Sequence, residues 1–140
     1  MTSLFHSRKK RRRRLRPGGI APRVTVVGPC ASGKTTLVNL LRKQRLDAHS
    51  VAQEHSSAPG MYLRAGPDYV VYLGVSYDEI LRRRSVSWGR SRYRAQRKRL
   101  QRARNDADIC IDTDCKSPAE ICEIVMDFLT RRGEQWNRSY

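Results

Sequence analysis

The sequence contains no uninterrupted apolar run of the length that a membrane-spanning helix needs, which is about 18 residues or more. Its first charged block, residues 8–16, is not followed by the apolar stretch that characterises a secretory signal. These absences predict a cytoplasmic protein without a transmembrane segment, and an arginine-rich transit peptide is the alternative reading of the start.

Paired cysteines are also missing. The four cysteines form no C-x-x-C pair, and their spacing fits no zinc motif, so a zinc ribbon or a thioredoxin-like redox site is not predicted. Reduced thiols in a cytosolic protein are the expectation. The cysteines are Cys30, Cys110, Cys115 and Cys122.

Acidic residues are absent from two segments of a chain with net charge +16. Residues 1–23 hold nine Lys/Arg, and residues 82–104 hold eleven, while the rest of the chain is mildly acidic. Self-repulsion predicts that residues 1–22 form a disordered basic arm, able to bind nucleic acid or another polyanion through residues 8–16. The remaining length fits one domain, residues 23–132, followed by a tail over residues 133–140.

Alternating signals for strands and helices predict a three-layer α/β fold with a small parallel sheet of about four strands. Helices are expected after the first strand, then from Ser76 to about Ser85, over residues 90–104, and from Ser117 to Gly133, with N-caps at both serines. The strands are expected at residues 24–27, 49–54, 69–75 and 109–112.

The stretch GPCASGKT matches G-x-x-x-x-G-K-[ST] at every fixed position, and it follows a β-branched strand and precedes an amphipathic helix. A chance match somewhere in the chain has odds on the order of half a percent. In such a loop the backbone N–H groups cradle phosphates, Lys34 reaches the β- and γ-phosphates, and Thr35 offers its hydroxyl to Mg²⁺. The residues predicted to bind the nucleotide here are Gly28, Pro29, Cys30, Ala31, Ser32, Gly33, Lys34, Thr35 and Thr36.

Three stretches in the right order resemble the P-loop kinase group, which includes adenylate, shikimate, gluconate and dephospho-coenzyme A kinases. They are GPCASGKTT, then DYVVYLGVSYDEILRRR, then ADICIDTDCKSPAEICEIVMDFL. The chain also resembles short bacterial P-loop proteins that are described as ATPases or as kinase-like and whose substrate is unassigned. The resemblance implies a P-loop NTPase fold that binds ATP and Mg²⁺, with Lys34 as a catalytic residue.

The resemblance also implies a lid and an adenine-side loop. Residues 82–104 correspond to the basic lid of these kinases, and a solvated basic helix face is the alternative. The loop after the last strand, with Thr113 and Asp114, would lie beside the adenine. The lid arginines expected to contact phosphates are Arg83, Arg84, Arg90, Arg92 and Arg94.

The acid that assists Mg²⁺ or activates the acceptor is harder to assign, because Gly74 stands where many relatives carry aspartate. The strongest candidate is Glu54, at the end of the expected second strand, with Gln53 and His55 contacting substrate. An exposed polar turn is the alternative reading of this stretch. Weaker candidates at the last strand are Asp112 and Asp114.

Two functions remain after this reading. One is a Mg²⁺-dependent kinase or ATPase that uses ATP, with a small-molecule acceptor, because the short connection over residues 56–68 leaves little room for a large one. The other is a nucleotide-binding module or slow NTPase that associates with nucleic acid, or with another polyanion, through its basic arm.

Overall fold

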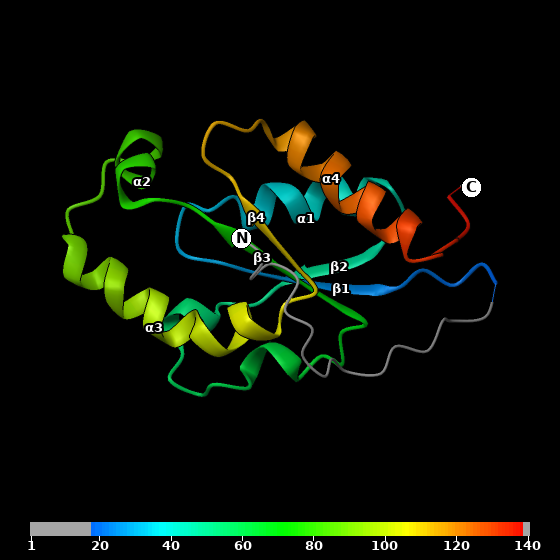
Figure 1. Ribbon diagram of the computed structural model, residues 1–140, viewed down its shortest axis with the longest axis horizontal. Helices are drawn as coiled ribbons and strands as arrows, with labels where there is room; N and C mark the ends of the chain where they lie inside the picture. The colour runs from blue at the N-terminus through cyan, green and yellow to red at the C-terminus, as the bar shows by residue number, and fades with distance from the viewer. Residues whose placement is uncertain (1–17, 139–140) are drawn as a thin grey trace.

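The sheet at the centre of the molecule has four parallel strands in the order β2-β1-β3-β4 (Figure 1), in a computed structural model that describes residues 18–138. The predicted α/β class and the parallel sheet of about four strands are confirmed. The predicted basic arm over residues 1–22 lies largely outside the described residues, including all of residues 8–16. The strands are β1 (Arg23–Val27), β2 (Asp47–Ser50), β3 (Tyr69–Gly74) and β4 (Ile109–Asp112).

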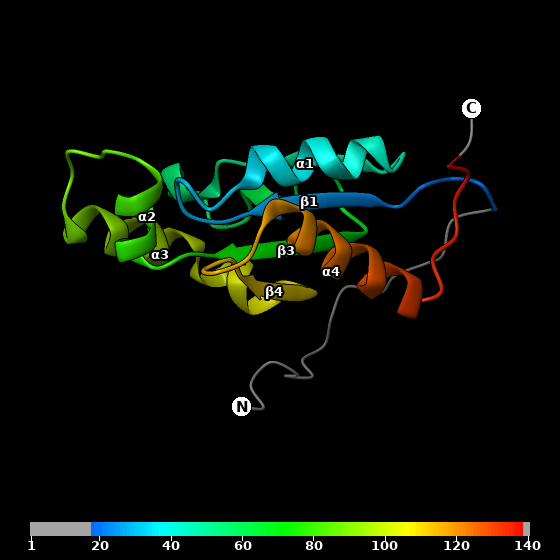
Figure 2. The same cartoon turned by 90° about the horizontal axis from the view of Figure 1, so that it is seen from above.

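Helices cover both faces of this sheet. Helices α1 and α4 lie on one face and α3 lies on the other, while α2 follows the carboxyl end of β3 (Figures 1 and 2). Two short 3₁₀ turns, η2 (Gln53–His55) and η3 (Met61–Leu63), connect β2 to β3. The α-helices of the described part are α1 (Lys34–Lys43), α2 (Tyr77–Arg83), α3 (Arg90–Asp106) and α4 (Pro118–Arg131).

The side chains of β3 alternate between the two faces, as a strand period of two requires. Tyr69, Val71 and Leu73 pack into the cluster under α1 and α4, whereas Val70 and Tyr72 pack toward α3. A strand buried on both faces reads as a continuous apolar run, which is why YVVYLG was recognisable in the sequence.

The two predicted helix caps differ in the structure. Ser117 and Glu120 form a complete capping box at α4, with each side chain accepting from the other residue's backbone N–H. At α2 only half of the box forms, because Ser76 Oγ accepts from the N–H of Glu79 while the N–H of Ser76 donates to Asp114 Oδ1 at 3.1 Å.

The second strand is shorter than predicted, and this moves Glu54. Strand β2 ends at Ser50 rather than at Glu54, because β2 pairs with β1 alone and the ladder ends with the bond from Val51 N to Val26 O. Glu54 therefore lies in the 3₁₀ turn η2, one turn beyond the sheet edge. The second 3₁₀ turn, η3, follows in the same connection and buries Tyr62.

The segment after α4 returns to the domain. Gly133 ends the helix with a positive φ of 84°. Trp136 is buried and donates its indole N–H to the carbonyl of Gln44 at 2.8 Å. Tyr69 donates its hydroxyl to Glu134 at 2.6 Å. The segment thus buries Glu134 and adds Trp136 to the core under α1. Across residues 18–138, no helix combines the length and the apolar character that crossing a bilayer demands.

Candidate functional site

The loop between β1 and α1 has the tight geometry that its glycines predict. A Cβ atom on Gly28 would lie 2.5 Å from the carbonyl oxygen of Leu73 and 2.7 Å from Ser32 Oγ, so only glycine fits there. Gly33, the N-cap of α1, has a φ of 98°, a conformation that favours glycine. Both fixed glycines of the motif are therefore required by the backbone path.

Lys34, the first residue of α1, folds back over this loop. Its Nζ donates to the carbonyls of Gly28 at 2.8 Å and Pro29 at 3.1 Å, and it pairs with Glu54 Oε2 at 2.8 Å. The ion pair is nearly closed to solvent, with 13% of the lysine side chain and 4% of the glutamate side chain exposed. The structure thus brings together the two predicted catalytic residues, Lys34 and Glu54.

Within residues 18–138, two buried side-chain oxygens lack a hydrogen-bond partner, and both belong to this loop region. They are Ser32 Oγ and Glu54 Oε1. Ser32 is 1% exposed and Glu54 is 3% exposed. Unsatisfied buried oxygens are costly and uncommon, so their occurrence at one site indicates a place that a bound group completes.

The start of α1 presents further hydrogen-bonding groups. The first bond of the helix ladder runs from Leu37 N to Gly33 O, so the backbone N–H groups before Leu37 precede the ladder. Thr35 and Thr36 are exposed at this end. The positive end of the helix dipole and these donors favour an anion, and the Thr35 hydroxyl is available to a cation beside it.

Cys30 is held between two parts of the chain that are remote in sequence. Its backbone N–H donates to Gln96 Oε1 at 3.0 Å, and Gln96 Nε2 donates to the Cys30 sulfur at 3.2 Å. On its other side the sulfur lies 3.3 Å from His55 Nε2. Helix α3, which contains most of the basic segment, is therefore hydrogen-bonded to the loop through Gln96.

Arg83 is the lid arginine that contacts the loop. It donates to the carbonyl of Ala31 at 2.8 Å and to that of Thr113 at 2.9 Å, and Glu79 holds its Nε at 3.0 Å. A hollow of about 310 Å³ lies beside it. The hollow is lined by Ala31, Ser32, Gly33, Thr36, Leu37, Glu79, Arg83, Arg84, Lys116, Pro118 and Ile121.

The other predicted lid arginines are not gathered at the loop. Arg84 borders the hollow. Arg90 pairs with Asp78 at 3.2 Å and lies over the Tyr77 ring, and Arg92 lies over Trp88. Arg94 is exposed on α3. Of the five arginines, the structure brings Arg83 and Arg84 to the loop between β1 and α1 and leaves the other three along the start of α3.

The predicted adenine-side residues are engaged inside the protein. Thr113 is fully buried and donates its hydroxyl to the carbonyl of Gly74 at 2.8 Å. Asp114 accepts from the N–H of Ser76. Neither residue lines the hollow of 310 Å³, whereas Lys116 and Pro118 of the following turn do. The last loop borders the hollow through Lys116 and Pro118, and an adenine contact by Thr113 and Asp114 stays a prediction.

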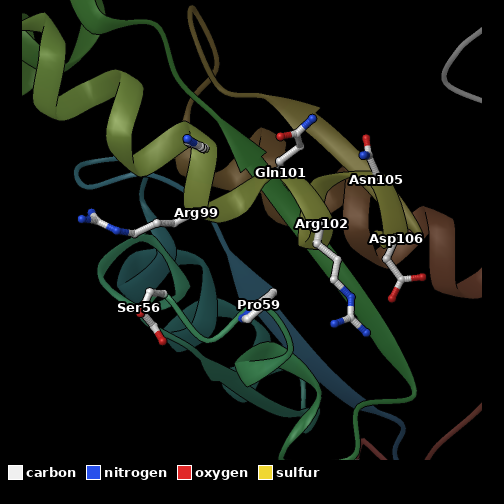
Figure 3. A pocket seen from close by; sticks show the side chains of 9 residues that line it. Ser56, Pro59, Arg99, Gln101, Arg102, Asn105 and Asp106 are labelled. Atoms are coloured by element: carbon white, nitrogen blue, oxygen red, sulfur yellow. The ribbon is translucent and has the colours of Figure 1, made fainter.

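A second and larger hollow, of about 760 Å³, opens between α3 and the connection that follows η2 (Figure 3). Ser56 and Pro59 lie on one side of it, and Arg99, Arg102 and Asp106 lie on the other. The short connection predicted little room here, so this groove is larger than expected. It is lined by Ser56, Ser57, Pro59, Lys98, Arg99, Gln101, Arg102, Asn105 and Asp106.

Sequence reasoning missed two residues that build the site. Gln96 binds Cys30, and Arg99 donates to the backbone carbonyl of Glu54 at 3.1 Å. Gln96 shares the buried face of α3 with Leu100 and Ala103. Their helical spacing was a usable signal, but the charge of the segment concealed it. Arg99 carries no signal that separates it from its basic neighbours.

A comparison with models of known protein families and with curated protein sequences finds no match. The likeness to the P-loop kinase group therefore stays a prediction from the motifs.

Proposed function

We propose that the protein is a P-loop NTPase that binds ATP with Mg²⁺ and acts as a small-molecule kinase or ATPase. The observation that carries this proposal is the pairing of Lys34 with the buried Glu54 at the mouth of a loop whose glycines, helix start and unsatisfied Ser32 oxygen suit a phosphate chain. An ordinary glycine turn requires neither a buried lysine nor a buried carboxylate.

In this proposal each loop residue has a defined task. The N–H groups at the start of α1 and the Ser32 hydroxyl donate to phosphate oxygens. Lys34 exchanges the carbonyls of Gly28 and Pro29 for the terminal phosphates, so the loop-bound lysine is a resting position. Thr35 offers an oxygen ligand to Mg²⁺, which neutralises phosphate charge when it is bound. Arg83 and Arg84 add positive charge on the other side.

The two hollows suggest where the nucleoside and the acceptor bind. We assign the nucleoside to the hollow of 310 Å³ beside Arg83, Lys116 and Pro118. We assign the acceptor to the groove under α3, because Arg99 both lines the groove and holds the backbone of Glu54. Lys98 and Arg102 give this groove a positive charge, which suits an acceptor that carries an anionic group.

Glu54 then serves as the base. Its carboxylate is buried, its Oε2 is held by Lys34, and its Oε1 is unsatisfied and able to accept a proton from an acceptor hydroxyl or from water. Withdrawal of Lys34 toward the phosphates leaves the carboxylate free to act, which couples nucleotide binding to activation of the acceptor.

Calorimetric titration with ATP and Mg²⁺ tests the proposal. We expect Lys34→Ala to lose binding, and Lys43→Ala, in the exposed last turn of the same helix, to bind like the wild type. Glu54→Gln should keep binding but lose ATP turnover, measured with a panel of hydroxyl compounds that carry phosphate or carboxylate groups. Absence of ATP binding in the wild type, or full turnover in Glu54→Gln, would contradict the proposal.

A second candidate function, a nucleotide-binding module at nucleic acid, is favoured by the exposed flank of α3. There Arg97 lies 5.8 Å from the centre of the partly exposed Tyr93 ring, and Arg97 and Arg104 line one hollow with it. Cations beside an accessible aromatic ring suit single-stranded nucleic acid.

Binding of a single-stranded RNA to the full chain at increasing salt concentration tests this alternative. Two variants separate the sources of affinity. One variant replaces the eight Lys/Arg of residues 8–16 by serine, and the other combines Arg97→Ala with Arg104→Ala. Each should weaken binding and reduce its salt dependence. If both variants bind like the wild type, neither basic segment is a nucleic-acid interface.

A further inference from the structure

We propose that Cys30, Glu54 and His55 form a binding site for zinc at the mouth of the phosphate loop. One ligand atom from each residue lies within 4.8 Å of the others. The sulfur of Cys30 is 3.3 Å from His55 Nε2, and His55 Nε2 is 3.7 Å from Glu54 Oε2. The site shares Glu54 with the proposed function, but it stands on these side chains and does not require nucleotide binding.

Two of the three ligand separations are close to the edges of a tetrahedral zinc site, and the third is within 4.8 Å. Bonds of about 2.3 Å to sulfur and about 2.0–2.1 Å to nitrogen and oxygen, at tetrahedral angles, put neighbouring ligand atoms about 3.3–3.5 Å apart. The two measured separations, 3.3 and 3.7 Å, lie within a few tenths of an ångström of these values. Thiolate, imidazole and carboxylate are each zinc ligands, and three protein ligands with a fourth position open to water is the arrangement of catalytic zinc sites.

The surroundings of the cluster favour a bound cation. Lys34 holds Oε2 of Glu54, whereas Oε1 is buried and has no hydrogen-bond partner in residues 18–138, so the carboxylate has an oxygen to offer a metal. Gln96 accepts from the Cys30 N–H through Oε1, which orients its amide so that Nε2 donates to the sulfur. Such outer hydrogen bonds orient ligands in metal sites and stabilise the thiolate. The thiol proton leaves to solvent when the metal binds.

The location gives the zinc site a consequence for the loop. Lys34 Nζ lies 2.8 Å from the same carboxylate that the metal would use. Zinc and the lysine therefore compete for Glu54, and each weakens the other's hold on it. A bound zinc ion would also tie Cys30 of the loop to His55 of η2 and restrict the movement of the loop relative to η2.

Titration of the full chain with Co²⁺ and Zn²⁺ tests the site directly. Co²⁺ should give a thiolate-to-metal charge-transfer band, and Zn²⁺ should displace the Co²⁺ and raise the thermal midpoint. Cys30→Ser and His55→Ala should each weaken Zn²⁺ binding by at least about 10–100-fold, the range known even for outer-shell losses. Cys115→Ser, at an exposed cysteine outside the cluster, is the matched control and should bind like the wild type.

Lys34→Ala separates this proposal from nucleotide binding. It removes the competing cation, so we expect Zn²⁺ to bind several-fold more tightly while ATP binding is lost. His55 is half exposed, so its variant should fold even if a change at Cys30 does not, and far-UV circular dichroism verifies this. Absence of Zn²⁺ binding, absence of the thiolate band, or equal affinity in His55→Ala and the wild type would each overturn the site.

Discussion

The two faces of the sheet are built on different principles. On the face covered by α1 and α4, sixteen buried residues of the described chain form one cluster, whereas the cluster on the α3 face has seven. Helix α3 contributes only Gln96, Leu100 and Ala103 to the interior and carries eight Lys/Arg. The first face supplies most of the apolar burial, and the second is left to polar contacts.

This difference explains where the groove and the polar site lie. A helix with so many cations cannot lie flat on an apolar sheet, because each cation must keep its charged end in water. The flank of α3 therefore stands open as the groove of 760 Å³, and its inner side reaches the loop through Gln96 and Arg99. The contrast predicts that matched substitutions on the two faces reduce the free energy of unfolding by different amounts.

The largest difference is expected for core truncation. Leu41→Ala, in the larger cluster, should reduce the free energy of unfolding by about 3–5 kcal/mol, because a cavity in a well-packed core cannot collapse. Leu100→Ala is as fully buried but borders the open face, where relaxation is easier, so we expect about 2–3 kcal/mol. Urea unfolding of both variants measures the difference. If Leu100→Ala costs as much as Leu41→Ala, the contrast between the faces does not hold.

Removal of an arginine should have a smaller effect. Arg83 donates to two backbone carbonyls and pairs with Glu79, with a quarter of its side chain exposed, so Arg83→Ala should cost about 1–2 kcal/mol. Arg99 makes one carbonyl bond from an exposed position, so Arg99→Ala should cost about 0.5 kcal/mol. Chemical unfolding at two salt concentrations compares them. If the two substitutions reduce the free energy of unfolding equally, the second carbonyl bond and the ion pair of Arg83 add no stability beyond that of a single bond.

The larger face was readable from the sequence because its signals are local. The run YVVYLG, the motif GPCASGKT and the cap Ser117 with Glu120 each specify their own conformation, and the structure has all three as predicted. The four parallel strands follow from the alternation of strand and helix signals. For these parts local propensity and tertiary packing agree.

The site itself was readable only in part, because its other residues act over long sequence distances. Glu54 was selected by type, but its place in a 3₁₀ turn depends on where the pairing of β2 with β1 stops. The contacts of Gln96 with Cys30 join residues 66 positions apart, and nothing in the local sequence encodes them. The lining of the hollow by Lys116 and Pro118 likewise depends on which side chains the fold buries.

Helix caps give a third comparison between the faces. Ser117→Ala removes the complete capping box of α4 and should cost about 1 kcal/mol. Helix α3 begins at Gly89 without a side-chain cap or an acidic residue in its first turn. Gly89 has an extended backbone and open space around its Cβ, so Gly89→Asp should stabilise the protein by about 0.5–1 kcal/mol. Thermal unfolding measures both, and no gain from Gly89→Asp would indicate that α3 does not limit stability.

The smallest effect is expected at the edge of the sheet, where His49 of β2 lies. Burial lowers the pKa of His49, and the nearby Arg23 and Arg42 lower it further, while Asp47 opposes them. Its Nε2 is 2.8 Å from the Thr25 hydroxyl, which suits a neutral ring. Because the pKa is lower in the folded state than in the unfolded one, this contribution to stability is present above the ordinary histidine pKa of about 6.5 and is lost as the pH falls through the folded value.

The thermal midpoint should therefore fall more steeply between pH 7 and pH 5 in the wild type than in His49→Gln, which keeps a partner for Thr25 but does not titrate. If His49→Gln retains the wild-type slope, the pH dependence comes from other groups, and the edge strand is not sensitive to protonation at this residue.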